Sequence, residues 1–239
     1  MRVSDLLGSE ILDARGNELG HVYDVRLVQD GAPVGPFGAS LRLRSLVIGV
    51  TAAGSRLGFE RLDVGGPWPL RAAFSALHGR IRPAGWEEIA SIEDERIRLR
   101  VDADRMHGDS RPGQDLGRVM DAGLELLDRQ MIDIDGRMAG NVDDLELTFP
   151  PEGGPPAVTA ILSGPGALAR RIGGRIGDAI AKVHARLQES DIEGPARVSF
   201  GVVTSVGSDV RLAVSREDLE IDRFERWVRD TIIAKIPGS

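Results

Sequence analysis

The fold is decided by two stretches of sequence, LGSEILDARGNELGHVYDVRL at 7–27 and LDRQMIDIDGRMAGNVDDLEL at 127–147. Aligned at an offset of 120 residues, they share seven identical positions, where average composition would give roughly one or two by chance. An internal duplication is the better explanation. The identical pairs are Leu7/Leu127, Asp13/Asp133, Gly16/Gly136, Gly20/Gly140, Val22/Val142, Asp24/Asp144 and Leu27/Leu147.

Each stretch predicts a β-hairpin. In the first copy, apolar residues 11–12 lead into a polar turn, after which the apolar pattern resumes. Gly16 would supply the positive φ that a tight turn needs, and Gly20 would allow a bulge or close packing. Gly136 and Gly140 hold the same two places in the second copy.

Beyond the turn, the sequence alternates in the way of a strand with one buried and one solvated face. Apolar residues at 25 and 27 alternate with Asp24 and Arg26. We therefore expect Asp24 and its equivalent Asp144 on the solvated face. The second copy repeats the pattern, with Leu145 and Leu147 beside Asp144 and Glu146.

The same order of elements follows both hairpins. A Gly/Pro-rich break is expected to interrupt the chain, and a third strand, a helix and two closing strands are expected after it. This makes the chain mainly β with inserted helices, as two small tandem barrels would need. The elements are breaks at 31–38 and 150–156, third strands at 43–48 and 157–162, helices near 70–77 and 167–188, and closing strands at 86–92, 97–101, 197–206 and 209–214.

The boundaries of the domains follow from composition. The polar, Gly- and Pro-containing stretch after the first copy is typical of a linker. After the second copy, Ser215 with Glu217 and Asp218 resembles a capping box that opens an amphipathic C-terminal helix. The predicted organisation is a first domain at 1–101, a linker at 102–118, a second domain at 119–214, and a C-terminal helix and tail at 215–239.

Composition excludes several classes of function. The 239-residue chain carries a net charge of −7, which argues against a surface dedicated to nucleic acid. Because there are no cysteines, disulfides and thiolate chemistry are excluded. There is no signal-peptide pattern and no apolar run of spanning length, so a cytoplasmic protein with at most peripheral membrane contact is expected.

The sequence predicts no catalytic residue, cofactor or metal site, and therefore no enzyme. There is no nucleophile motif of the G-x-S-x-G type. The histidines have no metal-ligand spacing, so each is expected to be hydrogen-bonded internally or exposed. They are His21, His78, His107 and His184.

Two further stretches resemble ligand loops but have simpler interpretations. The acidic DIDG at 133–136 is similar to the start of a calcium loop, yet a hairpin turn whose aspartates accept bonds from local amides explains it better. The Gly-rich stretch 163–177 lacks the Walker lysine and the dinucleotide spacing, which favours a turn that leads into a packed helix.

The amphipathic helices are the clearest candidates for contacts with other molecules. The helix at 167–188 bears arginines beside its apolar stripe, and it could cover its own barrel, dock in a partner's groove or lie on anionic lipid. The C-terminal helix combines aromatic and arginine side chains, which dominate interface hot spots. The candidate partner-binding residues there are Arg223, Phe224, Arg226 and Trp227.

The two hairpin motifs resemble the opening segment of the PRC-barrel family. The match covers both halves of the chain, and it rests on a pattern of Leu, Asp, Gly, Gly, Val and Asp at fixed spacing. The residues are Leu7, Asp13, Gly16, Gly20, Val22 and Asp24 in the first copy, and Leu127, Asp133, Gly136, Gly140, Val142 and Asp144 in the second.

This resemblance implies two tandem PRC-type barrels that serve as protein-interaction modules, with no catalytic set to transfer. The family includes the cytoplasmic domain of the photosynthetic reaction-centre H subunit and a domain of a ribosome maturation factor. A non-catalytic adaptor or scaffold is the leading hypothesis, with a protein or a second copy of the chain as partner. The alternatives are a ribosome-associated assembly factor and a peripheral regulatory subunit of a membrane complex.

Overall fold

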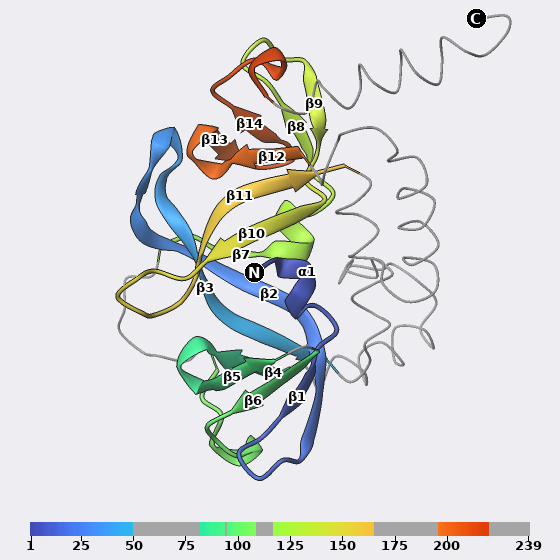
Figure 1. The fold of residues 1–239 in the computed structure, drawn as a ribbon, viewed down its shortest axis with the longest axis vertical. Helices are drawn as coiled ribbons and strands as arrows, with labels where there is room; N and C mark the ends of the chain where they lie inside the picture. Colours follow the sequence, from blue (N-terminus) through green and yellow to red (C-terminus); the bar gives the residue numbers. More distant parts are fainter. Residues whose placement is uncertain (50–81, 94, 109–116, 165–195, 220–239) are drawn as a thin grey trace, which may run out of the picture. The chain divides into compact units, whose positions relative to one another are not determined.

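The protein is mainly β, as the sequence predicts, and its sheet is curled (Figure 1). This computed structural model describes residues 1–49, 82–93, 95–108, 117–164 and 196–219. Within these ranges, α-helix is limited to α1, Val3–Leu6. The helices predicted near 70–77, at 167–188 and at the C-terminus lie outside the described residues, except that Arg216–Asp218 form a 3₁₀ turn.

Two compact units make up the chain, and neither is contiguous in sequence. Each sequence repeat contributes the tip of its long hairpin to the unit that holds most of the other repeat. The predicted domains, in contrast, are contiguous stretches. Unit 1 comprises Met1–Ala32, Ser40–Leu124 and Leu147–Ala157, and unit 2 comprises Pro33–Ala39, Glu125–Glu146 and Val158–Ser239.

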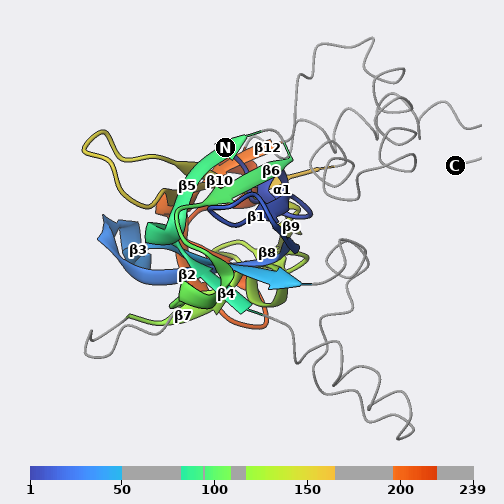
Figure 2. The same ribbon diagram turned by 90° about the horizontal axis from the view of Figure 1, so that it is seen from below.

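In unit 1, the strands follow the order β3-β2-β1-β6-β5, and β4 pairs with β3 while β7 pairs with β2. The β1–β6 pair is parallel, and β5 runs antiparallel to β6 (Figure 2). The strand bounds are β1 Glu10–Leu12, β2 Glu18–Val34, β3 Gly38–Gly49, β4 Arg82–Gly85, β5 Ile89–Glu93, β6 Arg96–Leu99 and β7 Val119–Asp121.

In unit 2, β13, β14, β8 and β9 form one sheet in that order, and β11 pairs with β12. The β8–β14 pair is parallel, like β1–β6 in unit 1. The strand bounds are β8 Gln130–Ile132, β9 Met138–Asn141, β10 Asp144–Thr148, β11 Ala157–Ser163, β12 Ala196–Ser199, β13 Val203–Val206 and β14 Val210–Leu212.

The repetition extends from the hairpins to the closing strands. After the first turn, the amide of Ala14 donates to the carbonyl of Val101 at 3.1 Å. In the second copy, the amide of Ile134 donates to the carbonyl of Val214 at 3.2 Å. Each copy therefore ties its turn to the residue two positions after the end of its last strand, β6 or β14.

The exchanged hairpin tips are held by specific contacts. In unit 2, the ring of Phe37 meets the buried ring of Phe200 edge to face, with centroids 5.3 Å apart. In unit 1, Ala157 pairs with Arg42 of β3, and the ring centroids of Phe149 and Trp86 are 5.9 Å apart. Each tip therefore contributes an aromatic side chain to the unit in which it lies.

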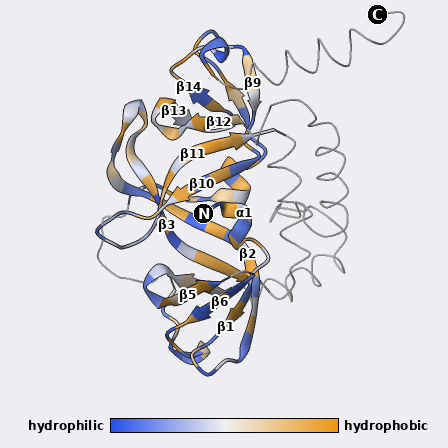
Figure 3. Cartoon of the chain, viewed as in Figure 1, coloured by the Kyte–Doolittle hydropathy of each residue, from blue (hydrophilic) through white to orange (hydrophobic). Residues whose placement is uncertain are grey.

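The cores are mostly aliphatic, in line with an aromatic content of 4%. Hydrophobic residues recur along the strands (Figure 3). Each fully buried Leu, Ile or Val side chain contributes about 1.5–3 kcal/mol of transfer free energy. The alternating pattern of the strands thus supplies the main driving force for folding. Fully buried examples are Ile11, Val22, Leu41, Leu46 and Ile97 in unit 1, and Met131, Val142, Leu145, Phe200 and Val203 in unit 2.

Three sequence predictions about strands need correction. Strand β2 continues through the first Gly/Pro-rich break as far as Val34, and only the 3₁₀ turn Gly35–Phe37 separates it from β3. The strand predicted at 197–206 is divided by a 3₁₀ turn at Phe200–Val202. The strand predicted at 86–92 begins as a 3₁₀ turn, Trp86–Glu88. Glycine and proline thus mark turns here without ending the sheet.

Candidate interaction surfaces

Both hairpin turns are built around one aspartate. Asp13 Oδ1 accepts hydrogen bonds from the amides of Arg15 and Asn17, at 2.9 and 2.8 Å. Asp133 Oδ1 accepts from the amides of Asp135 and Arg137, at 3.0 and 2.7 Å. The interpretation of DIDG as a turn with locally bonded aspartates is therefore confirmed for Asp133.

The second oxygen of each carboxylate is also used. Asp13 Oδ2 accepts from Asn17 Nδ2 at 2.9 Å, and Asp133 Oδ2 accepts from the amide of Arg216 at 3.1 Å. The hydrogen bond from Asn17 is the main cause that lowers the pKa of Asp13. Burial opposes ionisation of Asp133, but the amides of Arg137, Arg216 and Asp135 outweigh it, so the pKa of this carboxyl is lowered too.

These lowered pKa values predict a loss of stability in acid. A carboxylate whose pKa is lower in the folded state stabilises the fold above its unfolded pKa, near 3.8, and this contribution disappears as the pH falls through the folded pKa. Urea unfolding should show that Asp13→Asn and Asp133→Asn are less stable than the wild type at neutral pH, by a margin that shrinks below about pH 4.

A matched control is Asp104→Asn, which changes an exposed aspartate on the 3₁₀ turn Ala103–Arg105. This exposed substitution should change the free energy of unfolding by no more than about 0.5 kcal/mol at neutral pH. Margins for the Asp13 and Asp133 variants that do not change with pH would contradict the proposed role of the two turn carboxylates.

The glycines of the motif have the backbone conformation that the sequence predicts. Gly16 and Gly136 have φ of 85° and 80°, and Gly20 and Gly140 have φ of 129° and 96°. A Cβ at Gly20 would collide with the carbonyl oxygen of Gly49. Close packing is therefore the reason for glycine at position 20, and the pairing of β1 with β2 also shifts register between Ile11 and Leu12.

The prediction that Asp24 and Asp144 lie on a solvated face is wrong. Asp24 is 6% exposed and Asp144 is fully buried. Asp24 Oδ1 accepts from the amide of Val25 at 2.6 Å and from the amide of Gly123 at 2.8 Å. Along β2, Val22, Asp24 and Val25 are all buried, so the inward face changes phase at the aspartate.

The turn of unit 2 exposes apolar side chains. Ile134 is 64% exposed and Met138 is 51% exposed, which makes them the most exposed large apolar residues in the described part of the chain. Met138 lies opposite the half-buried Ile132 in the β8–β9 pair, so their side chains share a face. We call Ile134 and Met138 the apolar tip.

The turn that carries the apolar tip also carries charged side chains. Arg137 Nη1 lies 3.5 Å from Glu217 and 3.9 Å from Asp135, and all three side chains are more than half exposed. An apolar centre with a solvated polar rim is the usual arrangement of a protein-binding surface.

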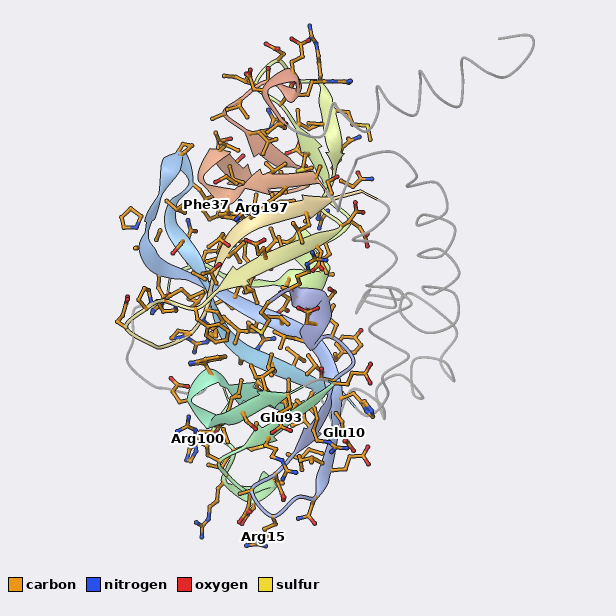
Figure 4. The ribbon with its side chains drawn as sticks, in the orientation of Figure 1. Glu10, Arg15, Phe37, Glu93, Arg100 and Arg197 are labelled. Carbon is orange, nitrogen blue, oxygen red and sulfur yellow. The ribbon has the colours of Figure 1, made fainter. Side chains whose placement is uncertain are left out.

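The equivalent turn of unit 1 is polar. Ala14 and Glu18 replace the two residues of the apolar tip, and Arg15 forms an ion pair with Asp102 at 2.9 Å. Figure 4 shows Arg15 at the outer end of this turn.

Beside that turn, β6 and the residue after it carry three arginines on one face, Arg96, Arg98 and Arg100, which we call the arginine row. Arg96 pairs with Glu10 at 2.9 Å, and Arg100 Nε donates to the carbonyl of Ile89 at 2.9 Å. Arg98 lies between them and is exposed. In unit 2, the last strand is β14, and the alternating positions on and beside it are Asp209, Arg211 and Ala213. The second copy therefore has no row of arginines.

Arg26 and Glu146 occupy equivalent positions of the two repeats but carry opposite charges, and each has an ion-pair partner within its own unit. Arg26 pairs with Asp121 of β7 at 2.8 Å, and Glu146 pairs with Arg197 of β12 at 2.7 Å. The bond from Arg197 is the main cause that lowers the pKa of Glu146. These two charges are therefore paired within their own units. The two turns, in contrast, expose different side chains to solvent.

The histidines form no site among the described residues. His21 is half-buried, and its Nδ1 has no hydrogen-bond partner there, which corrects the expectation of a satisfied or exposed ring. His107 is exposed, with Nδ1 3.8 Å from Glu88. His78 and His184 lie outside the described residues. Within those residues, no group of three or more His, Cys, Asp or Glu is placed to hold a metal ion.

The other predicted sites are only partly covered. Gly164, in the Gly-rich stretch 163–177, donates its amide to Asp143 Oδ2 at 2.6 Å, and the stretch beyond it lies outside the described residues. So do the candidate partner-binding residues Arg223, Phe224, Arg226 and Trp227. Across the described ranges, no helix has the length and hydrophobicity needed to cross a membrane.

Sequence reasoning missed both surface features. The signal for the apolar tip is present in the sequence DIDGRM at 133–138. Isoleucine and methionine are unusual in a turn whose other residues are Asp, Gly and Arg. The signal for the arginine row is the alternation R-I-R-L-R at 96–100.

Comparison with known proteins found no family model that matches this chain and no matching curated protein. The resemblance to PRC-barrels therefore rests on the two sequence motifs, and the interaction surfaces are argued from the structure itself.

Proposed function

We propose that this protein is a non-catalytic adaptor whose two units dock different partners. One observation carries the proposal. The same aspartate-centred turn presents Ala14 and Glu18 in unit 1, but the exposed apolar side chains of Ile134 and Met138 at the equivalent positions in unit 2. The two repeats keep the same turn backbone but expose different side chains, as two distinct binding sites would require.

The apolar tip suits the centre of a docking surface. Ile134 and Met138 lie on a turn that five hydrogen bonds or ion pairs hold in place. Because the turn is already ordered, little conformational entropy is lost when a partner binds. Methionine also adapts its shape to irregular partner surfaces. Large apolar side chains that are exposed together favour a binding role, and these two are the most exposed among the described residues.

The arginine row offers unit 1 a different kind of contact. Exposed arginines favour partners with carboxylate or phosphate groups, since the guanidinium group donates two parallel hydrogen bonds. This chemistry differs from that of the apolar tip, so the two units are proposed to recognise different surfaces. The barrel modules implied by the sequence motifs are interaction modules as well, which supports the same class of function.

A photo-cross-linking amino acid at Met138 of the full chain tests the proposal in the native cell. We expect a reproducible cross-linked protein from position 138, and a different pattern from the equivalent position Glu18. The same weak background at both positions would contradict it. Adding Ile134→Asp should abolish the product from position 138, which distinguishes docking at the tip from random collision.

A further inference from the structure

One end of the arginine row is neutralised within unit 1. In the register of the sheet, Arg96 lies between Glu10 of β1 and Glu93 of β5, and its Nε is 2.9 Å from Glu10. Arg100, at the other end of the row, lies apart from both carboxylates (Figure 4). Two carboxylates beside one guanidinium group leave no excess positive charge at the Arg96 end.

The centre of the row, in contrast, has neutral neighbours. Arg98 is exposed and lies between Leu12 of β1 and Ser91 of β5. Within the described residues, no carboxylate therefore lies opposite Arg98 on either neighbouring strand. Arg100 donates to a carbonyl, which is also neutral. The positive charge of the row is concentrated at Arg98 and Arg100.

The second repeat shows which group such an arginine binds. Arg211 of β14 lies between Ile132 of β8 and Ser205 of β13, just as Arg98 lies between an apolar residue and a serine. In unit 2, the chain itself supplies a carboxylate, because Asp209 Oδ1 lies 3.4 Å from Arg211 Nε. The equivalent guanidinium group is therefore satisfied inside its own unit.

From this comparison we infer that Arg98 and Arg100 bind an extended acidic segment of a partner protein. In unit 1, Arg96 holds the place of Asp209, so the carboxylate comes from another molecule. The inference rests on the proposed function, because it names the chemistry of the partner that docks on unit 1.

The edge of the sheet beside the arginine row suits an extended segment. Within the described residues, β5 is the last strand of its sheet and pairs only with β6. A strand added to this edge would lie about 10 Å from β6, with the small side chain of Ser91 between them. A glutamate opposite Ser91 would share a face with Arg98, within the combined reach of the two side chains. Main-chain hydrogen bonds would give affinity, and the guanidinium group would select carboxylates.

Fluorescence anisotropy of the full chain tests the inference with a labelled peptide in which glutamate alternates with threonine. We expect saturable binding that weakens as salt is added. Arg98→Gln should weaken it at least about tenfold, which is the contribution of one hydrogen-bonded charge pair. Arg211→Gln makes the same change in net charge at the equivalent position of unit 2. It should leave the affinity unaltered, because Arg211 is already paired.

A second variant blocks the site without removing Arg98. Arg96→Asp with Glu10→Gln gives unit 1 the residues that unit 2 has at these places, Asp209 and Gln130. The introduced aspartate should pair with Arg98 and weaken peptide binding as Arg98→Gln does. Because Arg98 is exposed, Arg98→Gln should keep the wild-type midpoint of urea unfolding.

Unchanged affinity of Arg98→Gln would overturn the inference, as would equal binding of a peptide with glutamine in place of glutamate. A peptide that alternates glutamate with proline cannot pair as a strand, so its equal binding would contradict docking at the β5 edge. Tighter binding of a single-stranded oligonucleotide would overturn the acidic protein partner in favour of nucleic acid. If the peptide fails to bind while the cross-linked product from position 138 is obtained, the inference is wrong and docking at the apolar tip stands.

Discussion

Asp24→Ala is expected to lower the free energy of unfolding by about 3 kcal/mol, which is among the largest effects of any single substitution at the repeated motif. The carboxylate accepts from the amides of Val25 and Gly123, and both bonds are buried. Alanine leaves these two donors without their acceptor, and each buried unpaired group costs about 1–3 kcal/mol. Urea unfolding of the full chain measures the change.

Asp24→Asn should lose less, because the amide keeps one oxygen that can accept both hydrogen bonds. Asp30→Ala is the matched control, since Asp30 forms a bidentate, partly exposed ion pair with Arg42 at 2.8 Å. Its removal should cost about 1 kcal/mol or less. If Asp24→Ala cost no more than Asp30→Ala, the assignment of Asp24 as a buried acceptor would be wrong.

Gly20→Ala should destabilise the protein by a similar amount, about 3 kcal/mol, for a different reason. The residue has φ of 129°, which an L-amino acid rarely adopts, and a new Cβ would collide with the carbonyl oxygen of Gly49. Backbone strain and displacement of β3 therefore add together. Thermal or urea unfolding measures the loss.

Gly16→Ala separates the two causes. Gly16 also has positive φ, 85°, but a Cβ there would meet nothing within 4 Å. This variant should lose only the strain, about 1–2 kcal/mol. Equal losses at the two positions would show that the approach of Gly49 contributes nothing.

The turns could be predicted from the sequence because their bonds are local. Asp13 and Asn17 are four residues apart, and the glycine between them sets the turn by its φ alone. Recurrence of the same spacing at Asp133 and Gly136 made the prediction stronger. Strand positions such as β3 and β11 also followed from short apolar runs.

The burial of Asp24 could not be predicted in this way, because its acceptor role involves Gly123, which is 99 residues away. Local alternation places an aspartate in solvent by default. A buried carboxylate becomes favourable only when distant amides converge on it, and the sequence gives no sign of that convergence.

The exchange of hairpin tips was hidden for the same reason. Glycines and prolines at 31–38 indicated a break in the sheet, yet Phe37 finds its partner in Phe200 within unit 2. Contacts between residues this far apart in sequence are set by tertiary packing, which overrides local turn signals.

The central claim is that the difference between the two turns serves binding and is not needed for folding. The most direct test gives unit 2 the turn residues of unit 1, as Ile134→Ala with Met138→Glu in a tagged full chain. Affinity purification from the native cell and urea unfolding are then measured on the same variant. We predict that a partner retained by the wild type is lost while the free energy of unfolding is unchanged. Retention of the same partners by a variant of unchanged stability would contradict the claim.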